Sequence, residues 1–348
     1  MNSSHPFRQL LAIAGRHWFL VGLLIVIPIG ISLGTSRLSA TIDGLISSIP
    51  KEALTAVVLF LMSVTLDGAR LVAALRSPRA VLAAAFVSQA IVPLIAFPML
   101  SLIEAPDLRL GLIIAASVPC TMAAASVWTR LARGNDAVSL LVTLLTNMLC
   151  FLITPAWLAL FADGPGVAAI AERLSFGSMM QKLIFAAVLP SLLGQLVRLV
   201  PAVRRHIDSG RIVFGNTAQG LILFLVYGSA VKAGFQIETG HELPGPGQVI
   251  LVWACCIVVH LVAMTICGFV GRAIRVDEED RVAMIFSGSQ KTLPIGLMVA
   301  QAAGVPLAIL PMLMYHGSQL FIDTWVAARI RIRPSSPPPP DADACVTP

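Results

Sequence analysis

Long apolar runs separated by short polar connections fill the chain as far as about residue 330. The runs fall at 18–36, 52–68, 79–103, 108–132, 136–162, 178–200, 212–234, 247–274, 280–303 and 305–330. Most of them are close to the roughly 20 residues that an α-helix needs to cross a bilayer. A transmembrane β-barrel would instead alternate in segments of about 10 residues. The pattern therefore predicts an all-α polytopic membrane protein with ten transmembrane helices.

Charge supports this class and orients the predicted helices. Charged residues make up 12% of the 348, whereas a soluble domain has about 25%. Of the 24 Lys and Arg residues, 17 fall on the side of both termini, six on the other side and Lys291 within a span. Because cytoplasmic loops carry the excess of Lys and Arg, we expect cytoplasmic termini in a cell (inner or plasma) membrane. This excess also explains the net charge of +6, and no basic cluster indicates nucleic acid.

The chain divides into a transporter domain, residues 1–334, and a tail, residues 335–348. The tail is rich in proline and has no apolar periodicity, which predicts disorder. The six cysteines form no Cys-x-x-Cys pair, so neither a metal site nor another cofactor is expected. The sequence also lacks a nucleophile with a base and a phosphate-binding loop, which argues against an enzyme.

Two spans are interrupted at matching places in the two halves of the chain. The span 108–132 contains Pro119 and the span 280–303 contains Pro294, each among small residues. With five helices per half, the halves enter the membrane in opposite directions, which predicts an inverted repeat. A single proline kink would indicate little, because such kinks are frequent in membrane helices. Two matched kinks with polar neighbours favour a secondary transporter whose site lies where the broken helices cross.

Lys291 lies near the centre of the span 280–303. A lysine there costs roughly 2.5–3.5 kcal/mol on insertion scales, which favours a functional role. The alternative is a structural lysine satisfied by backbone carbonyls of the broken helices. No carboxylate is expected at this depth, because Asp67 and Asp323 fall near the predicted inner ends of their spans. Lys291 is therefore expected either to be neutral or to pair with a bound anionic substrate.

Other polar residues inside the spans complete the candidate site. Amide and imidazole groups are costlier to bury than hydroxyl groups, so the favoured candidates are Gln89, Asn147, Gln290 and His316. His260 fits a packing histidine equally well. Most hydroxyl groups in membrane helices only bond the preceding turn or a neighbouring helix; the candidates of this kind are Ser126, Ser139, Thr143, Ser289 and Thr292.

Three stretches resemble the sodium/bile acid symporter family, in its SBF-like branch. They are VPCTMAAASVWTRLARGNDAVSLLVTLLTN at 118–147, VTLDGARL near Val64 and FVSQAIVP at Phe86. The resemblance implies ten helices in two inverted repeats, with a core of helices 3–5 and 8–10 and a panel of helices 1, 2, 6 and 7. It also implies that helices 4 and 9 break and cross, and that the substrates are organic anions often driven by sodium.

The sequence departs from the family where sodium coupling is expected. The resemblance places the family's polar ligands on Gln89, Ser126, Ser139, Thr143 and Gln290. A Ser of the helix 4 pair is replaced by Ala125, the Glu of helix 9 falls on Phe286 and its Asn falls on Lys291. Like charges repel strongly in a low-dielectric site, so the Lys291 ammonium is expected to replace a sodium ion.

These observations predict a secondary transporter of a small organic anion, with altered or lost sodium coupling. Transport is then expected to be coupled to protons or not coupled to an ion. One alternative is an ordinary sodium symporter that uses the five ligands named above. Another is a membrane regulator that binds a partner or ligand and does not transport. The expected partners are the lipid bilayer, the organic anion and, in the first alternative, Na⁺.

Overall fold

The first half of the chain contributes the helices up to α10. A computed structural model describes residues 18–36, 39–122, 124–161, 176–239 and 244–330. The helices of this half are α2 (Trp18–Gly34), α3 (Ser39–Ser47), α4 (Lys51–Val64), α5 (Gly68–Ala74), α6 (Pro78–Phe86), the π-helical turn η1 (Val87–Ile91), α7 (Val92–Ala96), η2 (Phe97–Leu102), α8 (Pro106–Ser117), α9 (Ala124–Leu131) and α10 (Asp136–Phe161).

The second half of the chain contributes the helices from α12 to α19. It contains α12 (Phe176–Leu183), the π-helical turn η3 (Ile184–Val188), α13 (Leu189–Val197), α14 (Pro201–Ser209), α15 (Arg211–Glu238), α16 (Pro246–Ala273), α17 (Glu278–Ser289), α18 (Leu293–Ala302), η4 (Pro306–Ala308) and α19 (Ile309–Arg329). The described residues form no strand, as predicted. The predicted disordered tail, 335–348, lies outside the described residues.

Five helical segments are long and apolar enough to cross a membrane: Pro78–Leu102, Asp136–Phe161, Phe176–Val197, Arg211–Glu238 and Pro246–Ala273. The number rises to seven if two bent pairs, α2 with α3 and α4 with α5, each count as one span. The other predicted spans are divided into shorter helices or, in α19, carry several buried polar residues. The multi-pass helical class is thus confirmed, while the count of ten stays a prediction.

The distribution of polarity is that of a protein in a bilayer. Lys291 and Asp323 are completely buried, whereas Leu24 is 72% exposed and Phe269 is 64% exposed. Large apolar side chains are commonly exposed along the outer helices, including α13, α15 and α16. Lipid can cover such side chains, because hydrocarbon tails are as apolar as leucine. The interior therefore holds the groups that need protein partners.

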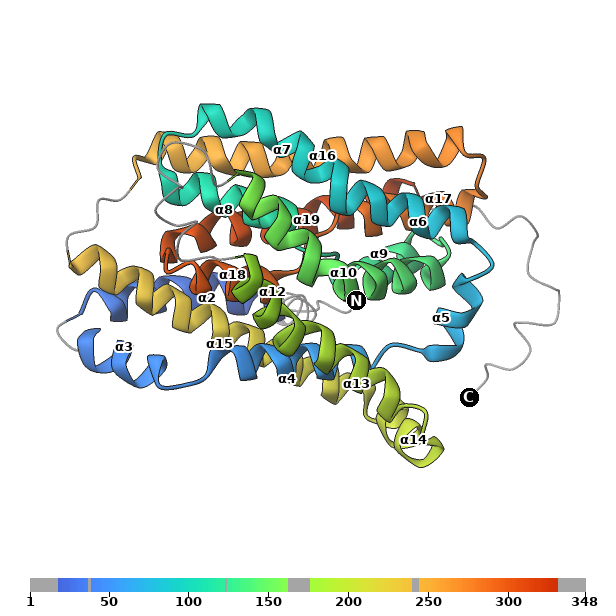
Figure 1. Cartoon of the computed structure of the whole chain (residues 1–348), viewed down its shortest axis with the longest axis horizontal. Coiled ribbons are helices and arrows are strands. Elements are labelled where there is room, and N and C mark those ends of the chain that lie inside the picture. Colours follow the sequence, from blue (N-terminus) through green and yellow to red (C-terminus); the bar gives the residue numbers. More distant parts are fainter. Residues whose placement is uncertain (1–17, 37–38, 123, 162–175, 240–243, 331–348) are drawn as a thin grey trace, which may run out of the picture.

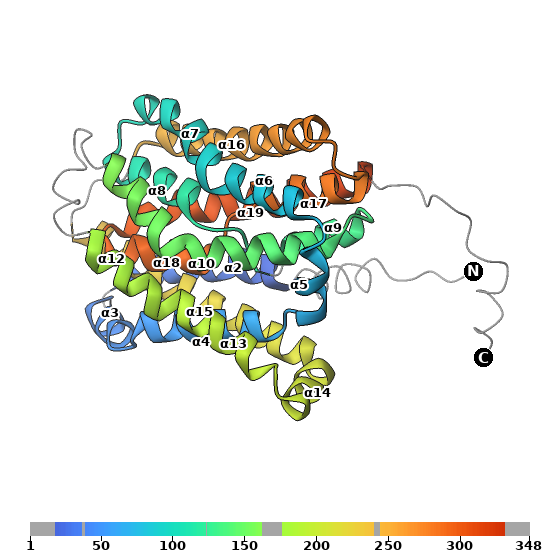
Figure 2. The same ribbon diagram turned by 45° about the vertical axis from the view of Figure 1, so that its right-hand side comes forward.

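The helices run mostly along the long axis of the molecule and lie in layers (Figure 1). α6, α7 and α16 form one outer layer, and α2, α3, α4 and α15 form the opposite one (Figures 1 and 2). Between them lie α8, α10, α17, α18 and α19. The middle layer contains both interrupted helices, so the interruptions are enclosed on two sides.

Small residues bring α2 and α15 into close contact in the lower layer. A Cβ atom on Gly34 would lie 2.2 Å from the Val231 oxygen, and one on Gly234 would lie 2.4 Å from the Ile31 oxygen. Gly30 lies one turn before Gly34, which gives the small-xxx-small spacing of closely packed membrane helices. The pair α2 and α15 therefore packs backbone against backbone.

Candidate substrate and ion site

The first interruption separates α8 from α9. α8 ends at Ser117 and α9 begins at Ala124, and Val118 already has an extended backbone (φ −66°, ψ 158°). Such a gap leaves N–H and C=O groups without helical partners, which is tolerated at membrane depth only where protein or water satisfies them. Thr154 on α10 donates to the Ser117 oxygen at 3.0 Å. This bond begins a series of contacts from α10 to the interruption.

Three further residues of α10 satisfy the interrupted backbone. Thr146 Oγ1 accepts from the Cys120 N–H at 3.2 Å, and Asn147 Nδ2 donates to the Cys120 oxygen at 2.9 Å. Thr143 Oγ1 donates to the Thr121 oxygen at 3.2 Å. α10 therefore supplies the hydrogen bonds that the segment between α8 and α9 cannot make within itself.

The second interruption separates α17 from α18. α17 ends at Ser289, and Gln290 and Thr292 are extended, with ψ of 148° and 132°. α18 begins at Leu293, with Pro294 in its first turn. A proline is tolerated there because the first N–H groups of a helix have no helical acceptor. Pro294 thus starts the second half-helix.

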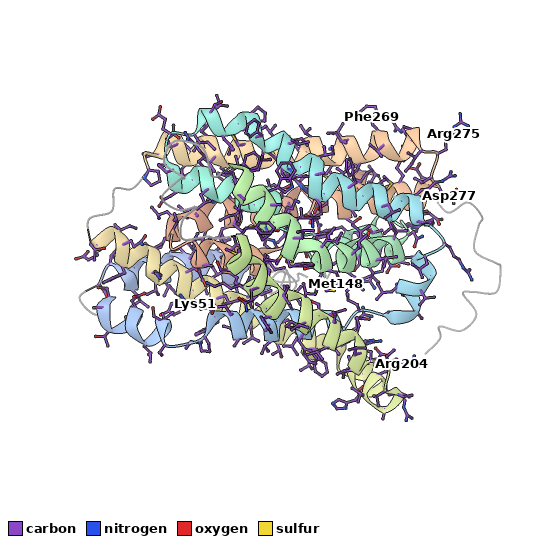
Figure 3. All side chains as sticks on the ribbon, in the orientation of Figure 1. Lys51, Met148, Arg204, Phe269, Arg275 and Asp277 are labelled. Carbon is purple, nitrogen blue, oxygen red and sulfur yellow. The ribbon has the colours of Figure 1, made fainter. Side chains whose placement is uncertain are left out.

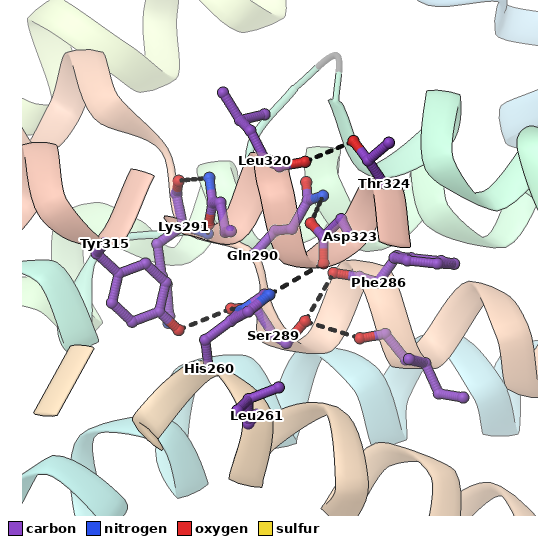
Figure 4. Close-up of polar contacts among 12 residues, drawn as sticks. His260, Leu261, Phe286, Ser289, Gln290, Lys291, Tyr315, Leu320, Asp323 and Thr324 are labelled. Carbon is purple, nitrogen blue, oxygen red and sulfur yellow. Dashed lines mark hydrogen bonds and ion pairs between the residues drawn. The ribbon is translucent and has the colours of Figure 1, made fainter. Parts of the chain in front are cut away.

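α19 satisfies this second interruption as α10 satisfies the first (Figure 4). Tyr315 donates to the Ser289 oxygen at 2.9 Å. Gln319 accepts from the Lys291 N–H at 2.9 Å and donates to the Lys291 oxygen at 3.0 Å. Because Tyr315 and Gln319 are four residues apart, they lie on one face of the helix. Asp323 follows after four more residues and extends this face.

The two interruptions touch, and Lys291 joins them. The Thr292 N–H donates to the Pro119 oxygen at 2.9 Å. The Lys291 Nζ donates to the Val118 oxygen at 3.0 Å, to the Ser88 oxygen and, at 3.4 Å, to the Ser88 hydroxyl. Ser88 lies in the π-helical turn η1, and such turns often occur at functional sites. The ammonium group of Lys291, which lies in the second half of the chain, is thus held by acceptors from the first half.

A carboxylate lies beside the second interruption, so the expectation that none would be found at this depth is wrong. Asp323 is completely buried, and its oxygens accept from His260 Nε2 at 2.9 Å and from Gln290 Nε2. It lies about 9 Å along α19 from the helix end at Arg329, at 1.5 Å per residue. The predicted and observed ends of this helix agree to within one residue; what the sequence did not predict is that Gln290, at the second interruption, contacts this part of α19.

His260 connects the same carboxylate to the end of α17. Its Nδ1 lies 3.3 Å from the Ser289 oxygen, while its Nε2 faces Asp323. Both ring nitrogens therefore face oxygen atoms, and only the doubly protonated ring can donate to both. The ring also meets Tyr315 edge-on, with 5.7 Å between centroids. His260 is part of a polar network rather than an isolated packing histidine.

Four buried oxygen atoms around the interruptions have no hydrogen-bond partner among the described residues. They are Gln89 Oε1, Asn147 Oδ1, Gln290 Oε1 and Thr292 Oγ1. Gln89 and Gln290 are each held at the other end of the amide, by the Thr146 oxygen and by Asp323. Buried polar atoms without partners are rare in native proteins. These oxygens are therefore available to a donor or a cation that enters the site.

Two further predicted candidates, Ser139 and Ser289, have hydroxyl partners within or between helices. Ser139 pairs with Thr129 at 2.7 Å and approaches the Ala283 oxygen at 3.4 Å, which ties α10 to α9 and α17. The Ser289 hydroxyl donates to the Ile285 oxygen of its own helix at 2.8 Å. Ser126 is buried on α9. The hydrogen bonds of the Ser139 and Ser289 hydroxyl groups go to α9 and to α17, the helix that contains Ser289 itself.

Sequence reasoning missed Gln319 and Ser88 and set Asp323 aside. The spacing of Tyr315, Gln319 and Asp323 by four residues was the available signal, because it aligns polar groups on one helix face. Ser88 gave no such signal, since its closest contact with Lys291 is made by a backbone oxygen in the π-helical turn η1. The described residues contain no group of three His, Cys, Asp or Glu side chains that could hold a metal ion.

Comparison with known proteins matches this chain to one family over almost its whole length. The model of the SBF-like CPA transporter family covers residues 17–332. An uncharacterized protein of Pseudomonas aeruginosa is 26% identical over 253 residues, which are 72% of this chain and 73% of that protein. The family model therefore covers both interrupted helices and the helices α10 and α19 that bond to them.

Two relatives carry names that state a transport function. The probable sodium/metabolite cotransporter BASS4, chloroplastic, of Arabidopsis thaliana is 25% identical over 236 residues, which are 65% of this chain and 53% of that protein. The sodium/bile acid cotransporter 7 of Mus musculus is 22% identical over 341 residues, which are 93% of this chain and 95% of that protein.

Proposed function

The chain belongs to the SBF-like CPA transporter family, and from this premise we propose that it carries a small organic anion across the membrane by alternating access. The observation that carries the proposal is the crossing itself. Two interrupted helices meet through the bond from the Thr292 N–H to the Pro119 oxygen, and both ends of this bond are buried. Paired interrupted helices from two halves of a chain form the substrate sites of many secondary transporters.

We propose further that the ten predicted spans form two inverted five-helix repeats. The support is that α10 holds the interruption of α8 and α9 in the same way as α19 holds that of α17 and α18. In this scheme, spans 3–5 and 8–10 form a core, and spans 1, 2, 6 and 7 form a panel against which the core moves. Both termini face the cytoplasm, in a cell membrane.

The substrate is an organic anion, because the positive N-terminal ends of two helices and the Lys291 side chain lie at the crossing. α9 and α18 both begin at the interruptions, and helix N-termini attract anions. Lys291 adds a positive charge, and no ion pair to it occurs among the described residues. The names of the relatives, which include bile acids and metabolites, agree with an organic substrate.

In this proposal the Lys291 ammonium stands where a sodium ion binds in other members of the family. Its acceptors are two backbone oxygens and a hydroxyl, which is the kind of oxygen ligand that a hard cation prefers. A sodium ion within a few ångströms would be repelled. Asp323 makes no ion pair with Lys291 among the described residues, and its oxygens accept from His260 and Gln290.

A second candidate function is sodium-coupled symport, and one observation favours it. The four unpartnered oxygens of Gln89, Asn147, Gln290 and Thr292 would suit a cation. A third candidate is a membrane regulator that binds an anion without moving it.

Uptake into vesicles distinguishes the three candidates. We expect purified protein in proteoliposomes to accumulate labelled organic anions, bile acids among them, equally with sodium or with choline outside. Lys291→Met should abolish uptake, because it removes the charge and leaves two buried carbonyls unbonded. Lys182→Met, on the exposed face of α12, is the matched control and should transport normally.

The opposite results are equally specific. A large stimulation by sodium would support the second candidate and refute ion replacement. Undiminished uptake by Lys291→Met would refute its role in anion transport. A membrane regulator would bind an organic anion, seen as thermal stabilisation of the protein, but would take up none of the labelled anions tested.

A further inference from the structure

Gln319 is a completely buried amide whose hydrogen-bonding groups are all used. Its Oε1 accepts from the Lys291 N–H at 2.9 Å, and its Nε2 donates to the Lys291 oxygen at 3.0 Å. A peptide N–H can only donate and a peptide oxygen can only accept. The peptide groups of Lys291 therefore fix which end of the Gln319 amide is oxygen and which is nitrogen.

This orientation determines the tautomer of His316. The second hydrogen of Gln319 Nε2 points to His316 Nδ1 at 2.9 Å. A nitrogen that receives a hydrogen bond carries no hydrogen in the neutral ring, so the ring hydrogen of His316 lies on Nε2. The backbone of the interrupted segment thus determines, through Gln319, which ring nitrogen of His316 can donate a hydrogen bond.

The Nε2–H group of His316 has no hydrogen-bond partner among the described residues. His316 is 7% exposed, and no hydrogen bond from its Nε2 is made to a described residue. The ring meets Phe19 of α2 edge-on, with 6.1 Å between centroids and an interplanar angle of 90°. His316 therefore lies where α19 approaches α2, with an unused donor in an apolar setting.

We infer that Gln319 is a positioning residue that presents His316 as an Nε2–H donor to the carboxylate of the transported anion. A hydrogen bond to an ionised oxygen is about twice as strong as one between neutral groups. Since Gln319 also holds the Lys291 peptide, the interrupted segment and the donor move as one unit. The inference rests on the proposed function, because it identifies a substrate contact of that site.

The tautomer can be measured without any substrate. We would label the histidines of the full chain with ¹⁵N in nanodiscs and assign His316 from the signals lost in His316→Gln. The wild type should show hydrogen on Nε2 and none on Nδ1. Gln319→Glu should move the hydrogen to Nδ1, because a carboxylate accepts where the amide donated. A role of Gln319 in packing alone would not change the tautomer.

Two results would overturn the positioning role. One is a wild-type ring with its hydrogen on Nδ1, directed at the nearby Lys291 oxygen. The other is an unchanged Nε2–H ring in Gln319→Glu. If that variant does not fold, Gln319→Met serves instead, and it should lose the single tautomer.

The anion contact is tested with acetate as the probe, against chloride at the same ionic strength. Acetate should shift the His316 Nε2–H signal in the wild type. His316→Gln places an amide donor near the position of Nε2, so acetate affinity measured by calorimetry should stay within about threefold. His316→Asn reaches only the position of Nδ1 and should weaken binding about tenfold or more.

Failure of this inference and failure of the proposed function give different results. If acetate causes no shift in the wild type, or if both His316 variants bind it equally, the anion contact is refuted, whatever the uptake assay shows. If the Nε2–H tautomer and the acetate shift are found but no organic anion is transported, the inference stands and the proposed function fails.

Discussion

Lys291 can be buried because its surroundings replace the water that it loses. Insertion of a lysine at mid-membrane costs roughly 2.5–3.5 kcal/mol, while hydrogen bonds that involve a charged group contribute about 1.5–3 kcal/mol each. The oxygens of Ser88 and Val118 and the Ser88 hydroxyl can therefore offset that cost. A lysine held in this way stabilises the crossing whether or not it also attracts substrate.

Asp323 is the second buried ionisable group, and its role is to orient others. By accepting from Gln290 Nε2 it turns the Gln290 oxygen away from itself, which leaves that oxygen without a partner. By accepting from His260 it also fixes α16 to α19. These contacts could not be read from the sequence, since they join residues 33 and 63 positions apart.

Asp323→Asn should destabilise the protein by about 1–3 kcal/mol, because one of the donors on His260 and Gln290 would lose its acceptor. The measurement is the thermal unfolding midpoint of the purified protein in detergent. Asp277→Asn is the control, since Asp277 is exposed and makes no side-chain cap bond to α17; its effect should be within about 0.5 kcal/mol. Equal midpoints for the two variants would show that the Asp323 contacts contribute nothing.

At the scale of elements, each interrupted helix depends on the helix that follows it. The α10 residues Thr143, Thr146 and Asn147 bond the first interruption, and Tyr315 and Gln319 of α19 bond the second. The bonds come from side chains on rigid helices, so the interrupted segments keep one geometry although they lack internal hydrogen bonds. Each half thus contains one interrupted helix and one helix that supports it.

Thr146→Val should destabilise the protein by about 1–3 kcal/mol, because the Cys120 N–H would be left buried without an acceptor. Valine has nearly the shape of threonine, so packing is preserved. Thr265→Val is the matched control: its hydroxyl is on an exposed part of α16 and only bonds the Leu261 oxygen one turn earlier. Thermal unfolding of both variants checks the prediction, and a larger loss in Thr265→Val would contradict it.

At the scale of the whole molecule, charge is distributed along the axis that would cross the membrane. Arg204 and Arg275 lie toward one end of the long axis, and Lys51 lies in the other half (Figure 3). Near the arginine-rich end, Arg70 and Arg130 pair with Asp136, and Arg198 pairs with Asp208 at 2.9 Å. The positive-inside rule predicts that this end faces the cytoplasm.

Labelling of single cysteines from outside intact cells tests this orientation. In a Cys345→Ser background, Lys51→Cys should react with a membrane-impermeant maleimide, and Arg204→Cys should react only after the cells are permeabilised. The cysteines Cys120, Cys150, Cys255, Cys256 and Cys267 are buried and should contribute little background. Labelling of Arg204→Cys but not Lys51→Cys in intact cells would reverse the proposed topology.

The sequence alone determined the class of the protein, the places of its interruptions and the position of Lys291 within one of them. These features follow from local chemistry: apolar length predicts a span, proline among small residues predicts a break, and a charge within a span is costly. Gln89, Asn147, Gln290 and His316 were also identified, because buried amides and imidazoles need partners.

Only the tertiary structure decided which partners these residues have. It joined Lys291 to Ser88 across 203 positions of sequence, and Gln319 to Lys291 across 28. It also moved Asp323 from an expected helix end to the interior beside Gln290. The physical reason is that a sequence gives the order of residues along each helix, whereas partners depend on how helices are rotated and staggered against one another.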